Sequence, residues 1–186
     1  MRIDPYVDQR PEFRAWFQDS KLINQHGGPL VIYHGTNLQF TAFCQGEEGI
    51  HLGTRKAALD RARALRSKQI LMPLYARLRN PLRVPDLGMW GFWTVMRAVR
   101  EVNAISEGQA EQAGSAFVGH SDARGWQMLH EALEGAGYDG FIYRNEVEGR
   151  SRERCRDSWV VFRPEQIKSA VGNSGHFDQA DPDIYH

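Results

Sequence analysis

The 186-residue chain has little cysteine and no long hydrophobic run. Its two cysteines, Cys44 and Cys155, show neither CxxC nor metal-ligand spacing, so we expect free thiols in a reducing compartment rather than a disulfide framework. No apolar stretch approaches the ~20 residues that a membrane helix needs, and the polar N-terminus does not resemble a signal peptide. We therefore expect a cytoplasmic protein without a membrane partner.

The chain also lacks an excess of charge and the common nucleotide motifs. Its 23 basic and 23 acidic residues cancel, which argues against broad phosphate-driven binding of nucleic acid but leaves room for a local basic patch. Neither GxGxxG nor GxxxxGK[ST] occurs. A bound nucleotide would therefore not be held in the Rossmann or P-loop manner.

The helix-like and strand-like segments of the sequence predict one α+β domain over residues 1–186. Helical periodicity is found at 11–17, after Thr54, at 92–102 and at 126–136, whereas 106–116 is polar and small, typical of a loop. Strand-like segments lie at 30–33, 49–54, 69–84, 138–145 and 158–164, and Pro73 favours an edge or a bulge in the third of them. The absence of regular strand–helix–strand alternation argues against a doubly wound sheet.

The first candidate site is the stretch "LVIYHGT" at 30–36. A short apolar run ends at Tyr33, and His34, Gly35 and Thr36 follow it. A glycine beside a polar strand end lets a ligand approach the main chain, while the ring and the hydroxyl offer hydrogen bonds. The alternative is that His34 is only a polar residue where the chain leaves the sheet.

The second candidate, "GIHLGT" at 49–54, again contains a histidine. Side chains alternate along a strand, so Ile50 and Leu52 would face one side and His51 the other. If the two strands are neighbours, His34 and His51 face one cleft. Otherwise His51 is on the solvent side of an edge strand.

These motifs, in this order, resemble the ADP-ribosyltransferase fold in its diphtheria-toxin and poly(ADP-ribose) polymerase branch. Together with "GYDGFIYRNEVEG" and "VVFRPEQIKSAVGNSGHFDQADPDI", they are similar to the domain of phage polyvalent proteins, MuF-type phage proteins and bacterial polymorphic toxins. The resemblance covers about 11–86 and 121–184. It implies a split β-sheet core flanked by short helices, with 87–120 as a helical insertion.

The resemblance also implies roles for the residues of the first two motifs. His34 would hydrogen-bond the adenosine ribose of NAD and the Gly35 backbone would hold the nicotinamide amide, with Tyr33 and Thr36 beside them. His51 stands where the family usually has a tyrosine that stacks on nicotinamide. A histidine there is also similar to the RNA 2′-phosphotransferase branch, which keeps an RNA substrate open.

The third motif departs from the family pattern. Its glutamate would fall on Ser158, which cannot stabilise positive charge as a carboxylate does. Three carboxylates lie nearby in the sequence, and we rank Glu146 first, because it directly follows an apolar strand, then Glu148, then Asp157. We expect no metal, because the remaining histidines are scattered.

The implied activity is the cleavage of NAD, used as a substrate, with transfer of ADP-ribose to a protein or RNA acceptor. The setting would be a phage, a bacterial toxin or a host regulator, and a toxin could have a neutralising immunity protein as a partner. Two alternatives stay open. RNA could be the acceptor, helped by Arg144, Arg150, Arg152, Arg154 and Arg156, or the domain could bind NAD or ADP-ribose without transfer.

Overall fold

Two β-sheets lie side by side at the centre of the molecule. The computed structural model describes residues 2–44, 48–65, 68–148 and 157–186. One sheet has the order β1-β3-β7 and the other β2-β6-β5-β4, and all neighbours are antiparallel except β4 and β5. The strands are β1 (Ile32–Thr36), β2 (Ile50–Leu52), β3 (Ile70–Ala76), β4 (Leu82–Arg83), β5 (Gly140–Arg144), β6 (Asp157–Val161) and β7 (Ile167–Ser169). The predicted split-sheet α+β architecture is confirmed.

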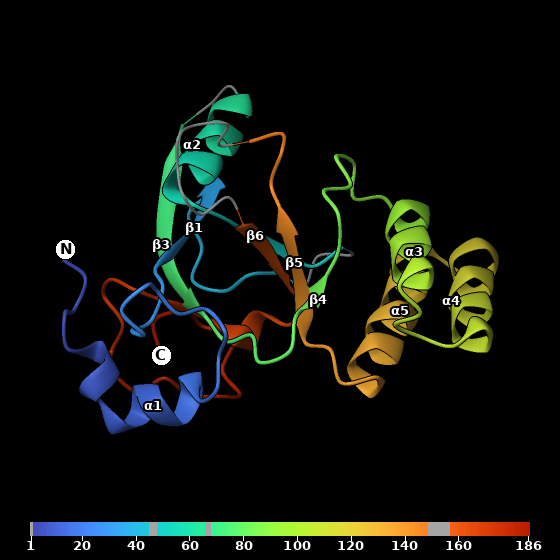
Figure 1. The fold of residues 1–186 in the computed structure, drawn as a ribbon. Helices are drawn as coiled ribbons and strands as arrows, with labels where there is room; N and C mark the ends of the chain where they lie inside the picture. Colours follow the sequence, from blue (N-terminus) through green and yellow to red (C-terminus); the bar gives the residue numbers. More distant parts are fainter. Residues whose placement is uncertain (1, 45–47, 66–67, 149–156) are drawn as a thin grey trace.

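The helices cover different parts of this core (Figure 1). Helix α2 packs on β1 and β3, while α3, α4 and α5 group together on the side of β4 and β5. The helices are α1 (Pro11–Phe17), α2 (Arg55–Ala64), α3 (Phe92–Glu101), α4 (Glu107–Gly119) and α5 (Asp122–Gly135), with short 3-10 turns at Val7–Gln9 and Pro164–Gln166. None of the helices in the described part of the chain is long and apolar enough to cross a membrane.

Two expectations about local structure are wrong. The first strand does not end at Tyr33: it runs to Thr36, with His34 at its centre, because β1 pairs with β3 along that whole length. The polar stretch 106–116 is not a loop but belongs to α4. Its N-terminus carries a capping box between Ser106 and Gln109, and small residues, Ala110, Ala113 and Ala116, form its buried face.

Pro73 lies in a central strand rather than at an edge. It is paired with Tyr33, whose N–H and C=O both turn away from β3 to bond Gly53. No N–H is therefore needed from residue 73 on the β1 side, and on the other side the Pro73 carbonyl accepts a hydrogen bond from the Ala170 N–H at 3.0 Å. The proline thus costs no ladder bond to β1, and toward β7 residue 73 accepts a hydrogen bond but has no N–H to donate.

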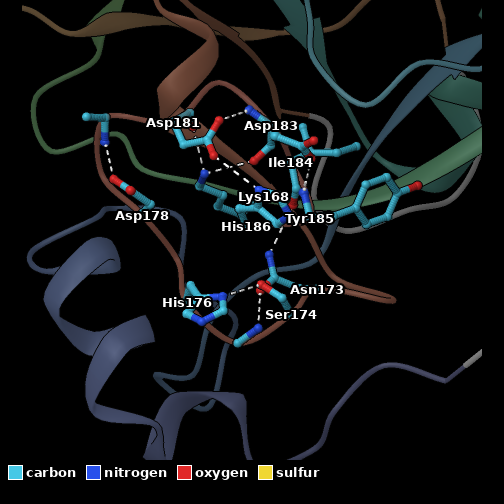
Figure 2. A network of polar contacts seen from close by, with 12 residues as sticks. Lys168, Asn173, Ser174, His176, Asp178, Asp181, Asp183, Ile184, Tyr185 and His186 are labelled. Carbon is cyan, nitrogen blue, oxygen red and sulfur yellow. Dashed lines mark hydrogen bonds and ion pairs between the residues drawn. The ribbon is translucent and has the colours of Figure 1, made fainter.

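The C-terminal segment folds back across β7 and is held mainly through its backbone (Figure 2). The Lys168 side chain is fully buried and donates to the carbonyls of Asp181 and Asp183 at 2.8 and 2.9 Å. Ile184, also fully buried, bonds through its backbone to Ser169 and Thr41. The segment therefore joins β7 to the loop that follows β1.

Candidate active site

A pocket of about 750 Å³ opens at the seam between the two sheets. Its walls come from β1, β2, one face of α2, the start of β6, the end of β5 and the segment 86–94 that precedes and begins α3. Six of the predicted site residues line it: Tyr33, His34, Gly35, His51, Glu148 and Ser158. The other three, Thr36, Glu146 and Asp157, are not part of its lining.

His34 presents a hydrogen-bond acceptor to this pocket. Its Nδ1–H donates to the backbone carbonyl of His51 at 2.9 Å, and because a carbonyl can only accept, Nδ1 carries the proton. In the neutral ring Nε2 is then an acceptor. Burial lowers the pKa of His34, the bond to His51 opposes this, and the Arg61 charge lowers the pKa further, so the ring is neutral at pH 7. Phe43 packs edge-on against it, with ring centroids 5.0 Å apart.

Gly35 is required by packing as well as by the pocket. A Cβ at this position would lie 1.9 Å from the carbonyl oxygen of Ala58, so α2 can approach β1 only over a glycine. Tyr33 bonds Gly53 at the strand edge facing the second sheet, and alternate peptide groups point to the same edge. The N–H and C=O of Gly35 therefore point to that edge, where no strand among the described residues pairs with them.

His51 lies across the seam from His34, between aromatic rings. Its Nδ1 is 3.5 Å from the Tyr143 hydroxyl, and its ring meets Trp90 edge-on at 4.9 Å between centroids. Nε2 is buried without a hydrogen-bond partner in the described chain, since the Glu48 carboxylate, at 4.0 Å, is beyond hydrogen-bonding distance. Burial, with smaller contributions from the Arg61 and His34 charges, lowers the pKa of His51 to about 4.

The aromatic wall behind His51 is a feature that sequence reasoning missed. Trp90 and Tyr143 have their ring centroids 4.7 Å apart and both line the pocket. Burial raises the pKa of Tyr143 well above its usual value, although a hydrogen bond with Ser158 opposes the shift. The sequence signal for Trp90 was its place in "GMWGF", where two glycines indicate a loop.

Asn145 follows β5 directly, a placement typical of a site residue, but sequence reasoning assigned it no role; in the structure it is buried and positions Glu148. Its Oδ1 accepts the backbone N–H groups of Val147 and Glu148 at 3.2 and 2.7 Å, which turns the chain back toward the pocket. Its Nδ2 donates to Ser158 Oγ at 3.0 Å and to Glu148 Oε2 at 3.4 Å. Ser158 is thus a buried support of this turn.

The three candidate carboxylates have different surroundings. Glu148 is half-buried in the pocket, and burial raises its pKa, opposed by the Asn145 hydrogen bond and by the Arg61 charge. Glu146 is exposed, and its backbone N–H donates to Asp86 at 2.7 Å. Asp157 is paired with Arg83 at 3.1 Å. Thr36 is buried, and its hydroxyl accepts the Leu38 N–H at 3.2 Å.

Arg61, from α2, is the one lysine or arginine among the described residues of the pocket lining, and sequence reasoning did not single it out. Arg144, expected as part of a basic patch, is exposed at the end of β5 and does not line the pocket. The other arginines of that patch, and Cys155, lie outside the described residues; Cys44 is an exposed free thiol at the pocket.

The described part of the lining combines a neutral imidazole acceptor, the unpaired peptide groups of Gly35, an aromatic wall, one cation and three carboxylates, those of Glu48, Asp86 and the half-buried Glu148. These groups suit a ligand with hydroxyls, an amide and an aromatic ring. A carboxylate can stabilise positive charge that develops on such a ligand or accept a proton from a nucleophile.

Comparisons with known proteins agree with the sequence resemblance. The model of the family described as "ADP-Ribosyltransferase in polyvalent proteins" matches residues 24–177, including 87–120, which the sequence resemblance had left out. No curated protein matches the chain significantly. A structure titled "Crystal structure of an anti-CRISPR protein" is similar at 13% identity over 72% of this chain and 89% of that chain, with a TM-score of 0.31 that carries no inference.

Proposed function

The chain belongs to the family of ADP-ribosyltransferases in polyvalent proteins, and from this premise we propose that it cleaves NAD and transfers ADP-ribose to a macromolecular acceptor. The observation that carries the proposal is the juxtaposition of His34, Gly35 and Glu148 around one pocket. His34 Nε2 accepts a ribose hydroxyl, and the peptide groups of Gly35 hold the nicotinamide amide. Trp90 and Tyr143 add an aromatic wall in the place of the family tyrosine.

Glu148 is the proposed catalytic carboxylate, in preference to Glu146, because it alone of the two lines the pocket. When the bond between ribose C1′ and the nicotinamide nitrogen breaks, its electron pair leaves with nicotinamide and positive charge develops on the ribose. A carboxylate beside the 2′-hydroxyl stabilises that charge. The acceptor nucleophile then bonds to C1′, and its proton passes to Glu148 or to solvent.

A second candidate function is a binding module that holds NAD or ADP-ribose without transfer. It is favoured by Ser158, which is buried at the family's glutamate position, where its Oγ accepts a hydrogen bond from Asn145. A serine hydroxyl carries no charge to stabilise the cationic ribose. In this candidate Glu148 is a structural partner of Asn145 and does not act on a ligand.

The acceptor and the biological setting are proposals of the same kind. The name of the matched family connects it with polyvalent proteins, which supports a phage or bacterial effector setting, with a toxin and its immunity protein as one form of it. Protein is the first acceptor that we propose. RNA is the second, because a histidine, His51, stands at the second motif.

One experiment separates these functions. The protein is incubated with cell lysate and NAD labelled in its adenylate phosphate, nicotinamide release is quantified, and protein and nucleic acid are then separated. A transferase for protein releases nicotinamide and places label in the protein fraction, and an RNA-directed enzyme places it in the RNA fraction. Binding of NAD by calorimetry without any nicotinamide release would overturn the transferase proposal in favour of the binding module.

A further inference from the structure

Arg61 supplies the fixed positive charge in the described part of the pocket lining. It lies on the α2 face that also carries Ala57 and Ala58, and this face forms one wall of the pocket. His34 and His51 add no charge at neutral pH, because burial keeps both rings neutral. Among the described lining residues, Arg61 is therefore the one cationic group that can bind an anionic part of a ligand.

The guanidinium is not used to hold the fold together. Arg61 is exposed, and among the described residues it forms neither a hydrogen bond nor an ion pair, although arginines in structural roles usually have both. The adjacent acid, Asp60, pairs with Lys56 at 2.8 Å and Arg63 at 3.6 Å on other faces of the helix. The five donors of Arg61 are thus available to a ligand.

The charge of Arg61 reaches the groups that we place in the site. It lowers the pKa values of His34 and His51, and it opposes the upward shifts that burial gives to Glu148 and Tyr143. Arg61 is itself part of the pocket lining, together with these four residues. A ligand bound there meets this charge directly.

We propose that Arg61 binds a phosphate group of the ligand in this pocket. A planar guanidinium matches two phosphate oxygens through paired N–H donors, and such charge-assisted bonds are among the strongest polar contacts. The phosphate belongs either to the diphosphate of the dinucleotide or to a phosphorylated acceptor. The identification of these two sources rests on the proposed function. The proposal that Arg61 binds a phosphate group does not.

Calorimetry with three adenine compounds tests the proposal without relying on catalysis. Adenosine carries no phosphate, ADP-ribose carries the diphosphate, and adenosine 2′-monophosphate represents a phosphorylated acceptor. Each is titrated into the full chain, into Arg61→Gln, and into Arg55→Gln as a matched control. Arg55 is an exposed arginine at the start of the same helix and does not line the pocket. Arg55→Gln therefore changes the net charge of the protein by the same amount as Arg61→Gln without removing a group from the pocket.

We expect Arg61→Gln to weaken ADP-ribose binding about tenfold to a hundredfold, the size of a lost charge-assisted pair, and to leave adenosine binding unchanged. An unchanged affinity for ADP-ribose with weaker binding of adenosine 2′-monophosphate would support the proposal with the acceptor as the source. Equal losses for adenosine and the phosphates, no loss for either phosphate compound, or the same losses in Arg55→Gln would overturn it. Failure to release nicotinamide would count against the proposed function only.

Discussion

Glu146 and Glu148 are two positions apart, yet their side chains are in different environments. The difference comes from Asn145, which precedes both. Its side chain accepts hydrogen bonds from the backbone N–H groups of residues 147 and 148, and this turns the chain toward the pocket at Glu148. The ranking from sequence placed Glu146 first since it follows the strand more closely. An Asx turn of this kind depends on tertiary burial of Asn145, between Glu148 and Ser158, which one sequence does not reveal.

His130 provides a prediction at the residue scale, away from the pocket. It is 3% exposed, stacks on Phe162 at 4.5 Å, and its Nε2 has no hydrogen-bond partner in the described chain. Burial lowers its pKa to about 4, from 6.5. A histidine with a lowered folded-state pKa keeps its full contribution to stability above pH 6.5, and that contribution is lost as pH falls from 6.5 to about 4, because the unfolded state then binds the proton.

We therefore expect the free energy of unfolding of the wild type to fall as the pH is lowered from 6.5 to 4. In His130→Leu it should fall less steeply, and the two slopes should differ by up to about 1.4 kcal/mol per pH unit. Leucine is apolar and of similar volume, so at pH 7 the variant should be within about 1.5 kcal/mol of the wild type. Urea unfolding at pH 7, 6 and 5 measures both quantities. The pKa of His51 is lowered to a similar value, so the free energy of unfolding of His130→Leu should still depend on pH. Identical slopes in the two proteins would contradict the lowered pKa of His130 in the folded protein.

At the scale of elements, the contact between β1 and α2 fixes the geometry of the pocket. Helix α2 begins at the Thr54 cap, directly after β2, and passes over Gly35 so closely that the Ala58 carbonyl takes the place of a Cβ. This contact holds in place the α2 face that carries Arg61 and lines the pocket. The sequence indicated the role of Gly35 as access for a ligand, and the structure adds a packing reason that no strand pattern contains.

Gly35→Ala should consequently destabilise the fold by about 1–3 kcal/mol or more, because a backbone carbonyl would have to move. Denaturant unfolding measures the loss. Gly108→Ala is the matched control: it is an exposed position in α4 with no atom within 4 Å of the added Cβ, and alanine there should stabilise by about 0.5–1 kcal/mol. A Gly35→Ala protein as stable as the wild type would show that β1 and α2 are not packed in this way.

Local signals predicted some elements and failed for others. The periodic apolar residues of α1, α3 and α5 and the cap at Thr54 were sufficient to predict those helices. Helix α4 was missed because its buried face consists of small residues, which give almost no hydrophobic periodicity. Pro73 was placed at an edge because its tolerance in β3 depends on the register with Tyr33, a tertiary property.

At the scale of the whole molecule, the pocket depends on segments that are far apart in the sequence. Residues 33–35 and 49–61 form one part, 86–94 a second, and 143–148 with Ser158 a third. The order of motifs in the chain was enough to predict the split sheet and the positions of His34 and His51. It could not predict Trp90, Tyr143 or Arg61, since their approach to the pocket follows from how the sheets and the α3–α5 region pack.

The central claim is that Glu148 is the carboxylate of an NAD-cleaving site, and nicotinamide release from NAD by Glu148→Gln beside Glu146→Gln tests it most directly. The two substitutions make the same chemical change two positions apart, and only one of them is in the pocket. We expect Glu148→Gln to lower the rate about 100-fold or more and Glu146→Gln to keep it within about threefold of the wild type. A wild-type rate in Glu148→Gln, or a loss confined to Glu146→Gln, would contradict the account.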